Sequence, residues 1–523
     1  IAIGGACSKI KTKQENQFSL QANRNAQHAA RTAQRATRNT EKEHIMKKNQ
    51  LKNFILIAVL ILATGGAMAY SSNKPAGFFS NWVSSPPHPH PGDDKILMAS
   101  GHLVQNKVLV GSEGTVGLNL TLQANDLATG DRPQIRTVDM VIVLDQSGSM
   151  QGRKLEDARR AVLELLSTLS AEDRFGMATY SEGVQITSGL VNVTEDHRAR
   201  LAAVVNGVRA GGGTNLGAGL QAGINLLRRP HRSDNAARVI LISDGLANRG
   251  ITDIEALTGL ASSAVEGEFS ISTVGVGAEF NEQLMTAIAD RGTGTYYYLE
   301  NPAAFAEVFH QEFHHTRTTA ITGLQIQIPL NTGITLSDAG GYPITIHHGQ
   351  AVFYPGDLRS GQTRKLYLTL HVPTNRQRTF GLDQVQVHYQ HNDRSYVTAL
   401  DQSYTIACVT DQRKVYSSID KTSWSEKVIN EDFNRLKQEV ASDIKSGKKQ
   451  EALKRIETYH DEQQALNAVV GSAGVADNLD HDVKELKTMV KDIFKGAPAA
   501  VHQKQKSNAK SLQYEGYRGR RSN

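Results

Sequence analysis

Asp145, Ser147 and Ser149 place three oxygen-bearing side chains at alternate positions in a short polar turn. The turn follows residues 138–144, an almost wholly apolar run typical of a buried central strand in a parallel sheet. A helical pattern begins near Arg153. Carboxylate and hydroxyl oxygens are ligands for hard cations such as Mg²⁺. The turn therefore predicts half of a metal site at the carboxyl end of the strand.

The other half of such a site must come from later loops at the same sheet edge, and two segments qualify. Residues 211–217 form a glycine-rich loop that presents Thr214, and its glycines allow the backbone to approach a metal closely. Residues 238–243 are a second buried strand, which ends at Asp244. These two segments supply one further hydroxyl and one further carboxylate.

The complete set resembles the metal-ion-dependent adhesion site of the von Willebrand factor A (VWA) family, over roughly residues 136–317. That site uses a D-x-S-x-S loop, a distal threonine and a distal aspartate. The matching residues here are Asp145, Ser147, Ser149, Thr214 and Asp244. The resemblance implies bound Mg²⁺, with Mn²⁺ or Ca²⁺ as alternatives, and a protein ligand whose Asp or Glu completes the metal shell. The alternative reading makes the two aspartates strand-end caps and the two serines ordinary turn formers.

Strands and helices alternate around these residues, which predicts an α/β fold with a doubly wound parallel sheet between residues 136 and 317. The expected strands are 138–145, 173–180, 238–243, 269–276 and 295–299. The expected helices are 153–169, 195–209, 216–229, 253–265, 281–291 and 302–316.

The segments that flank this domain alternate with the period of two that is typical of half-buried strands. Residues 93–135 are too few to close a core alone, so we expect them to form one β-sandwich with residues 318–410. The α/β domain would then be inserted between strands of the sandwich. An independent N-terminal sheet is the alternative. The arrangement resembles bacterial secreted VWA-domain proteins with flanking β structure.

Helical spacing of apolar residues then predicts an α-helical domain at residues 411–496, with two or three antiparallel helices. Residues 497–523 are polar and basic, and we expect them to be a disordered tail in which Arg518, Arg520 and Arg521 are solvated.

The N-terminal region carries the features of an export signal. Residues 46–69 combine a basic start, an apolar stretch and a small-residue cleavage pattern, which predicts a signal peptide. An uncleaved membrane anchor is the alternative. Residues 1–45 are interpreted as an upstream, non-structured segment, and residues 70–92 as a proline-rich linker. We therefore expect the protein to be secreted, periplasmic or at the cell surface, with membrane contact only through an uncleaved leader.

The charge of the chain is concentrated in this leader. Residues 1–69 contain eleven Lys and Arg and three Asp and Glu, whereas the whole chain has a formal charge of +6, so the remainder carries about −2. The high isoelectric point thus gives no support for nucleic-acid binding. Only Cys7 and Cys408 are present, which excludes a disulfide framework, and we expect Cys408 to be buried in a strand.

The sequence offers little competing chemistry. His310 and His314 have metal-ligand spacing on a helix, but the intervening Glu312 is displaced from the position of a zinc-protease base. No Walker A or G-x-S-x-G motif is present. We therefore expect that the protein is not an enzyme and has no small-molecule substrate. We expect an exported adhesion or interaction protein that binds an acidic residue of its ligand through the metal. The alternatives are a structural component of the cell envelope or an extracellular filament, and a non-catalytic recruiting subunit of an enzyme complex.

Overall fold

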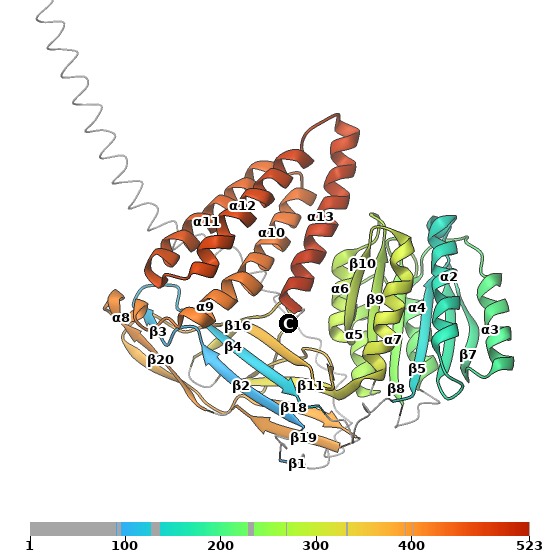
Figure 1. Ribbon diagram of the computed structural model, residues 1–523, viewed down its shortest axis with the longest axis horizontal. Coiled ribbons are helices and arrows are strands. Elements are labelled where there is room, and N and C mark those ends of the chain that lie inside the picture. Colours follow the sequence, from blue (N-terminus) through green and yellow to red (C-terminus); the bar gives the residue numbers. More distant parts are fainter. Residues whose placement is uncertain are drawn as a thin grey trace, which may run out of the picture. The chain divides into compact units, whose positions relative to one another are not determined.

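In the computed structural model, the residues whose structure is described all lie in one compact unit, Phe78–Asn523 (Figure 1). The described residues are 90–91, 96–126, 136–228, 235–267, 269–330, 333–392, 394–400 and 402–521. The predicted signal peptide and the segment before it lie outside them, as does most of the predicted linker. The end of that linker, His90–Pro91, is a short strand, β1, which pairs in parallel with Tyr396 and Val397.

A six-stranded sheet with helices on both faces forms the domain that contains the predicted metal site (Figure 1). Its strand order is β10-β9-β8-β5-β6-β7, and all neighbouring pairs are parallel except the last. The parallel strands are β5 (Val138–Asp145), β6 (Arg174–Tyr180), β8 (Ala236–Ser243), β9 (Ser270–Val276) and β10 (Thr293–Leu299). This order confirms the predicted doubly wound α/β fold.

Two hydrophobic cores lie on opposite faces of this sheet, which explains why every residue of the central strands β5 and β8 is buried. One core is covered by α2 (Arg153–Thr168), α3 (Glu195–Gly207) and α7 (Phe305–Arg317). The other is covered by α4 (Leu216–Arg228), α5 (Ile254–Glu266) and α6 (Glu282–Arg291).

The antiparallel edge strand β7 (Val184–Asn192) is an element that the sequence analysis did not predict. It forms a hairpin with β6, and its residues are partly buried or exposed. Because an edge strand needs no continuous apolar run, it lacks the signal that marked β5 and β8.

Strands that precede the α/β domain in the sequence pair with strands that follow it. In one four-stranded sheet β4 (Thr115–Ala124) lies between β2 (Leu97–Leu103) and β16 (Thr363–His371), and β12 (Thr335–Ala339) pairs with β16. A three-stranded sheet joins β3 (Lys107–Leu109) to β20 (Tyr404–Val409) and β17 (Arg378–Leu382).

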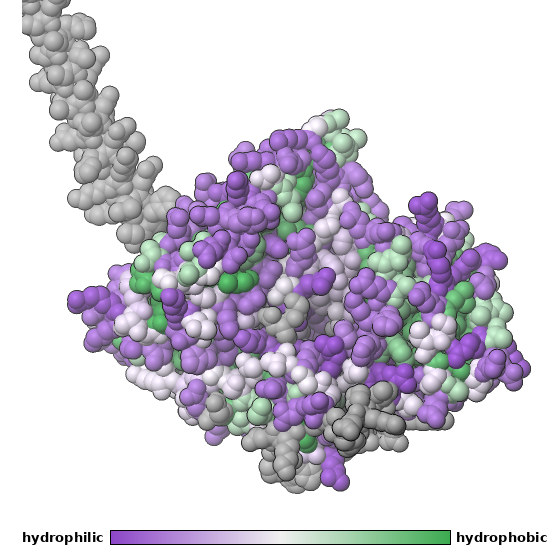
Figure 2. Space-filling model, viewed as in Figure 1, coloured by the Kyte–Doolittle hydropathy of each residue, from purple (hydrophilic) through white to green (hydrophobic). Residues whose placement is uncertain are grey.

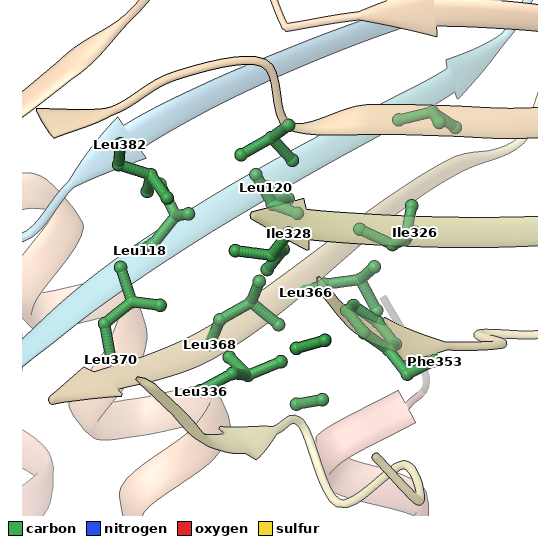
Figure 3. Close-up of a cluster of buried hydrophobic side chains, with 14 of the residues drawn as sticks. Leu118, Leu120, Ile326, Ile328, Leu336, Phe353, Leu366, Leu368, Leu370 and Leu382 are labelled. Atoms are coloured by element: carbon green, nitrogen blue, oxygen red, sulfur yellow. The ribbon is translucent and has the colours of Figure 1, made fainter. Parts of the chain in front are cut away.

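A further sheet contains β1 and the strands β11 (Thr319–Pro329), β13 (Thr345–His347), β14 (Gln350–Phe353), β15 (Leu358–Arg359), β18 (Gln386–His391) and β19 (Arg394–Ala399). Side chains from these sheets meet in one core, in which Leu118 and Leu120 of β4 lie near Ile328 of β11 and Leu368 of β16 (Figure 3). The α/β domain therefore lies in the sequence between strands that pair with one another in this β structure.

The predicted cysteine environment is present in this β structure. Cys408 lies in β20, is 3% exposed and is a free thiol. It belongs to the shared hydrophobic core.

The C-terminal part is helical. Its elements are α8 (Gln412–Tyr416), α9 (Lys421–Lys427), a π-helical turn η3 (Val428–Asp432), α10 (Phe433–Lys445), α11 (Lys449–Val470), α12 (Ala473–Ile493) and α13 (Pro498–Arg521). Apolar residues of these helices form a separate core that also includes Val104.

The last helix contradicts the prediction of a disordered tail at residues 497–523. Arg520 is bound by Glu431 and by Asp338, whose Oδ2 lies 2.7 Å from Arg520 Nη2, and Arg521 Nη1 lies 2.6 Å from Asp290 Oδ1. These acidic partners are distant in the sequence, so composition alone gave no sign of them. Only Arg518 of the three arginines is exposed, as expected.

The visible surface is mostly hydrophilic, with apolar side chains in small separate patches (Figure 2). Within the described part of the chain, no helix combines the length and the apolar character that crossing a bilayer requires.

Candidate metal centre

The two aspartates of the predicted site lie at the carboxyl ends of neighbouring strands. Asp145 is the last residue of β5, and Asp244 directly follows the last residue of β8. The two strands are paired in parallel, with Leu144 opposite Ile242. Parallel pairing brings both strand ends to one edge of the sheet, where ligands of open α/β sheets bind.

The loop after β5 is folded back on its own aspartate. The backbone N–H of Ser147 donates a hydrogen bond to Asp145 Oδ1 at 2.8 Å. A short 3₁₀ turn follows at Gly148–Met150, in which Met150 is buried and anchors the loop. The hydroxyls of Ser147 and Ser149 then lie 3.0 Å apart. The D-x-S-x-S spacing thus places both serine hydroxyls beside each other.

Hydrogen bonds connect this loop to the end of β8. Ser149 Oγ donates to Asp244 Oδ1 at 2.7 Å. Ser243 Oγ donates to Asp145 Oδ2 at 3.0 Å. Four of the five predicted residues therefore belong to one network, to which Ser243 is an addition that the sequence analysis missed.

Thr214 reaches the same place through the glycine-rich loop. Its backbone N–H donates to Asn248 Oδ1 at 3.0 Å, which ties the loop to the segment after Asp244. A Cβ placed on Gly245 would lie 3.5 Å from Thr214 Oγ1 and 3.6 Å from Ser149 Oγ. Glycine at position 245 therefore keeps open the space beside these two hydroxyls, and all five predicted residues meet at this edge.

The site buries both carboxylates but leaves one of its two serines exposed. Asp145 and Asp244 are 0% exposed, whereas Ser149 is exposed. Burial raises the pKa of Asp145 against the opposing hydrogen bonds from Ser147, and the nearby charge of Asp244 raises it further. Two buried carboxylates in electrostatic contact are stabilised by a nearby cation or by protonation of one of them.

Lys154 is the second residue that the sequence analysis missed. Its Nζ lies 2.5 Å from Asp244 Oδ2, and its side chain is 30% exposed. It is the second residue of α2, where the positive end of the helix dipole disfavours an ammonium group. A lysine at the start of a helix beside a predicted carboxylate cluster was therefore a usable signal of this pairing.

The oxygen ligands suit a hard divalent cation. Mg²⁺ prefers carboxylate, hydroxyl and water oxygens, and two aspartates with three hydroxyls leave coordination positions for water or a partner. The residues that would hold it are Asp145, Ser147, Ser149, Thr214 and Asp244. Across the described residues, no group of three or more His, Cys, Asp or Glu side chains is arranged to hold a metal.

The two histidines on α7 stand on either side of a buried glutamate in the sequence. His310 and His314 are exposed, whereas Glu312 between them is 0% exposed. The Glu312 carboxylate accepts hydrogen bonds from Arg238 Nη1 at 2.7 Å, Ser272 Oγ at 2.6 Å and Tyr297 OH at 2.6 Å. Glu312 is thus turned away from the exposed histidines and ties α7 to the sheet.

Comparison with known proteins supports the architecture around the site. Residues 139–311 match the family model of the von Willebrand factor type A domain. A solved structure described as von Willebrand factor type A from Catenulispora acidiphila superposes with a TM-score of 0.57 at 19% identity, over 83% of this chain and 97% of that one. The shared fold therefore extends beyond the matched domain.

Curated relatives match this chain over only part of their length. An uncharacterised protein of Synechocystis sp. is 27% identical over 262 residues, which are 48% of this chain and 61% of that protein. YfbK of Escherichia coli is 28% identical over 40% of this chain and 37% of its own length. Human inter-alpha-trypsin inhibitor heavy chain H1 is 24% identical over 53% of this chain and 28% of its own length.

Proposed function

We propose that this protein, which contains a VWA domain, is an exported interaction protein that binds an acidic residue of a protein ligand through a divalent cation, most simply Mg²⁺. VWA domains commonly mediate protein interactions. One observation carries the proposal: Asp145, Ser147, Ser149, Thr214 and Asp244 meet at one sheet edge, with both carboxylates buried and Ser149 exposed. Exposure at the site allows a partner to reach the cation.

The chemistry of the site favours binding over catalysis. The bound cation would supply a Lewis-acidic position that attracts a carboxylate oxygen. The aspartates would hold the cation, and the three hydroxyls would add neutral oxygen ligands. The hydroxyls add no negative charge, so only the two aspartates offset the charge of the cation, and a ligand carboxylate can complete its coordination shell. The proposal of a non-catalytic role rests on this donor set and on the sequence, which has no recognised nucleophile motif.

Export is supported by the sequence of residues 46–69 and is part of the proposal. It places the metal site outside the cytoplasm, facing extracellular, periplasmic or surface proteins. Fractionation of the source cells, with detection by an antibody against the VWA domain, tests this part. Recovery of the protein only from the cytoplasm contradicts it.

The binding mechanism is tested with phage-displayed random peptides selected on the immobilised full chain in Mg²⁺ and eluted with EDTA. We expect the selected peptides to share an Asp or Glu whose replacement by Asn or Gln abolishes binding. Thr214→Ala should lose these peptides, and Thr252→Ala, an exposed threonine on the loop before α5, should retain them. Peptides that bind equally in EDTA, or equally to Thr214→Ala, contradict the mechanism.

A further inference from the structure

Lys154 brings a cation of the protein itself into the candidate metal centre. Its ammonium group lies 2.5 Å from Asp244 Oδ2 and 3.4 Å from the carbonyl oxygen of Ser149. Asp244 Oδ1 accepts the hydroxyl of Ser149, so both oxygens of this carboxylate are engaged. A divalent cation that uses Asp244 must therefore compete with the lysine.

The fold holds the lysine at this place. Lys154 lies in the first turn of α2, where the helix dipole opposes its charge, so the contact with Asp244 offsets an unfavourable position. The chain passes close by at Gly277, where φ is +71°. A Cβ on Gly277 would lie 3.7 Å from Lys154 Cε and 3.8 Å from its Nζ. The neighbouring Arg153 is exposed and forms no part of this contact.

The charges at the centre show what the lysine does. Asp145 and Asp244 carry two negative charges, and the paired Lys154 brings the net charge of these three side chains to −1. A divalent cation then raises the net charge to +1 if the ammonium group remains nearby. Like charges a few ångströms apart repel one another appreciably at the partly buried edge of a protein. Lys154 therefore opposes the entry of the metal.

We propose that Lys154 is an intrinsic competitor of the metal, which neutralises Asp244 in the metal-free protein and lowers the affinity of the centre for a divalent cation. The inference rests on the proposed metal site and adds to it a residue that sets its affinity. In the loaded protein the same positive charge adds to that of the cation, which favours an anionic ligand.

The test is isothermal titration of Mn²⁺ into the full chain and into Lys154→Met. We expect Lys154→Met to bind Mn²⁺ roughly tenfold more tightly, since a nearby repulsive charge is removed. Arg153→Met removes the adjacent, exposed charge and should leave the affinity within roughly twofold of the wild type. An affinity of Lys154→Met that equals or falls below the wild-type value overturns the proposal.

Thermal unfolding supplies a second readout that does not depend on one variant. Lys154→Gln keeps a donor for Asp244 but has no charge. We expect Lys154→Met and Lys154→Gln to melt below the wild type in EDTA and to gain more than the wild type on saturation with Mn²⁺, because tighter binding to the native state adds more stability. An equal or smaller gain in Lys154→Gln contradicts the proposal. Failure of the wild type to bind Mn²⁺ instead contradicts the proposed function itself.

Discussion

At the scale of single residues, the chain separates two kinds of buried charge. Asp145 and Asp244 face the open edge of the sheet, and Lys154 is their cationic contact there. Glu312 and Arg238 lie inside the domain, where each is almost completely buried and their charges are paired. The first kind would hold the proposed cation, and the second ties helix α7 to the sheet.

Residue types at strand ends and in loops were enough to predict the group of side chains at the sheet edge. They were not enough to predict the buried pair of Arg238 and Glu312. Asp145, Ser147, Ser149, Thr214 and Asp244 each stand at a strand end or in a loop, where local pattern marks them. Arg238 and Glu312 stand within regular elements and meet across 74 residues. Nothing local indicates which of several polar residues on α7 turns inward.

Glu312→Gln should lower the free energy of unfolding by about 3 kcal/mol, because it leaves the buried Arg238 without its closest counter-charge. Chemical denaturation at neutral pH measures this. Glu307→Gln is the matched control, since Glu307 is exposed on the same helix, and it should change stability by less than about 0.5 kcal/mol. A loss of the same size in both variants contradicts the assigned role of Glu312.

The same variant has a defined pH dependence. Burial alone would raise the pKa of Glu312, but the charge of Arg238 and hydrogen bonds from Ser272 and Tyr297 hold it below its ordinary value of 4.5. The carboxylate therefore contributes stability above pH 4.5, which is lost as the pH falls through its folded-state pKa. The difference between the wild type and Glu312→Gln should accordingly shrink in acid.

At the scale of elements, the apolar pattern predicted the buried strands and failed for elements of mixed character. The runs that became β5 and β8 are buried over their whole length. The edge strand β7 and the helix α13 have no such signal. The sequence of α13 is strongly polar, and the helix is held by Lys510, Arg520 and Arg521, whose acidic partners come from distant segments.

Helix α13 also packs closely against α10 through small residues. A Cβ on Gly516 would lie 2.5 Å from the carbonyl oxygen of Asn434 and 2.7 Å from Gln438 Cγ. Gly516 is therefore required by the close approach of the two helices and not by a turn. Larger residues at this position must push α13 away from α10.

Gly516→Ala should destabilise the protein by about 1–3 kcal/mol despite the better helix propensity of alanine, since the methyl group overlaps backbone. Gly474→Ala is the control in α12, because a Cβ there meets nothing within 4 Å. It should be neutral or stabilising by up to about 1 kcal/mol. Thermal unfolding monitored by circular dichroism compares the two, and stabilisation by Gly516→Ala contradicts the packing described for α13.

At the scale of the whole molecule, the inserted VWA domain and the β structure around it could be predicted from a change of sequence period. The change marks where the sheet type alters, and the small size of residues 93–135 required strands from beyond the insertion. The pairing of β4 with β16 and of β3 with β20 provides them. The way in which α13 joins the other parts could not be predicted, because it depends on ion pairs between segments far apart in the chain.

The insertion bears on function because it leaves the carboxyl edge of the VWA sheet accessible. The pairing of β4 with β16 joins the chain segments before and after the domain, whereas Ser149, Leu246 and Ile251 are exposed in the loops that follow the carboxyl ends of β5 and β8. The site therefore depends on the local structure of three segments, which are the loop after β5, the loop at Thr214 and the end of β8, and on the parallel pairing of β5 and β8.

The most direct test of the central claim is a crystal structure of the full chain grown with Mn²⁺, with anomalous diffraction measured at the manganese edge. The account predicts one strong anomalous peak among the oxygens of Asp145, Ser147, Ser149, Thr214 and Asp244, with Lys154 Nζ moved away from Asp244. It also predicts that Thr214→Ala weakens or removes the peak. A peak at another place, or an empty centre beside an unmoved Lys154 at saturating Mn²⁺, would contradict the account.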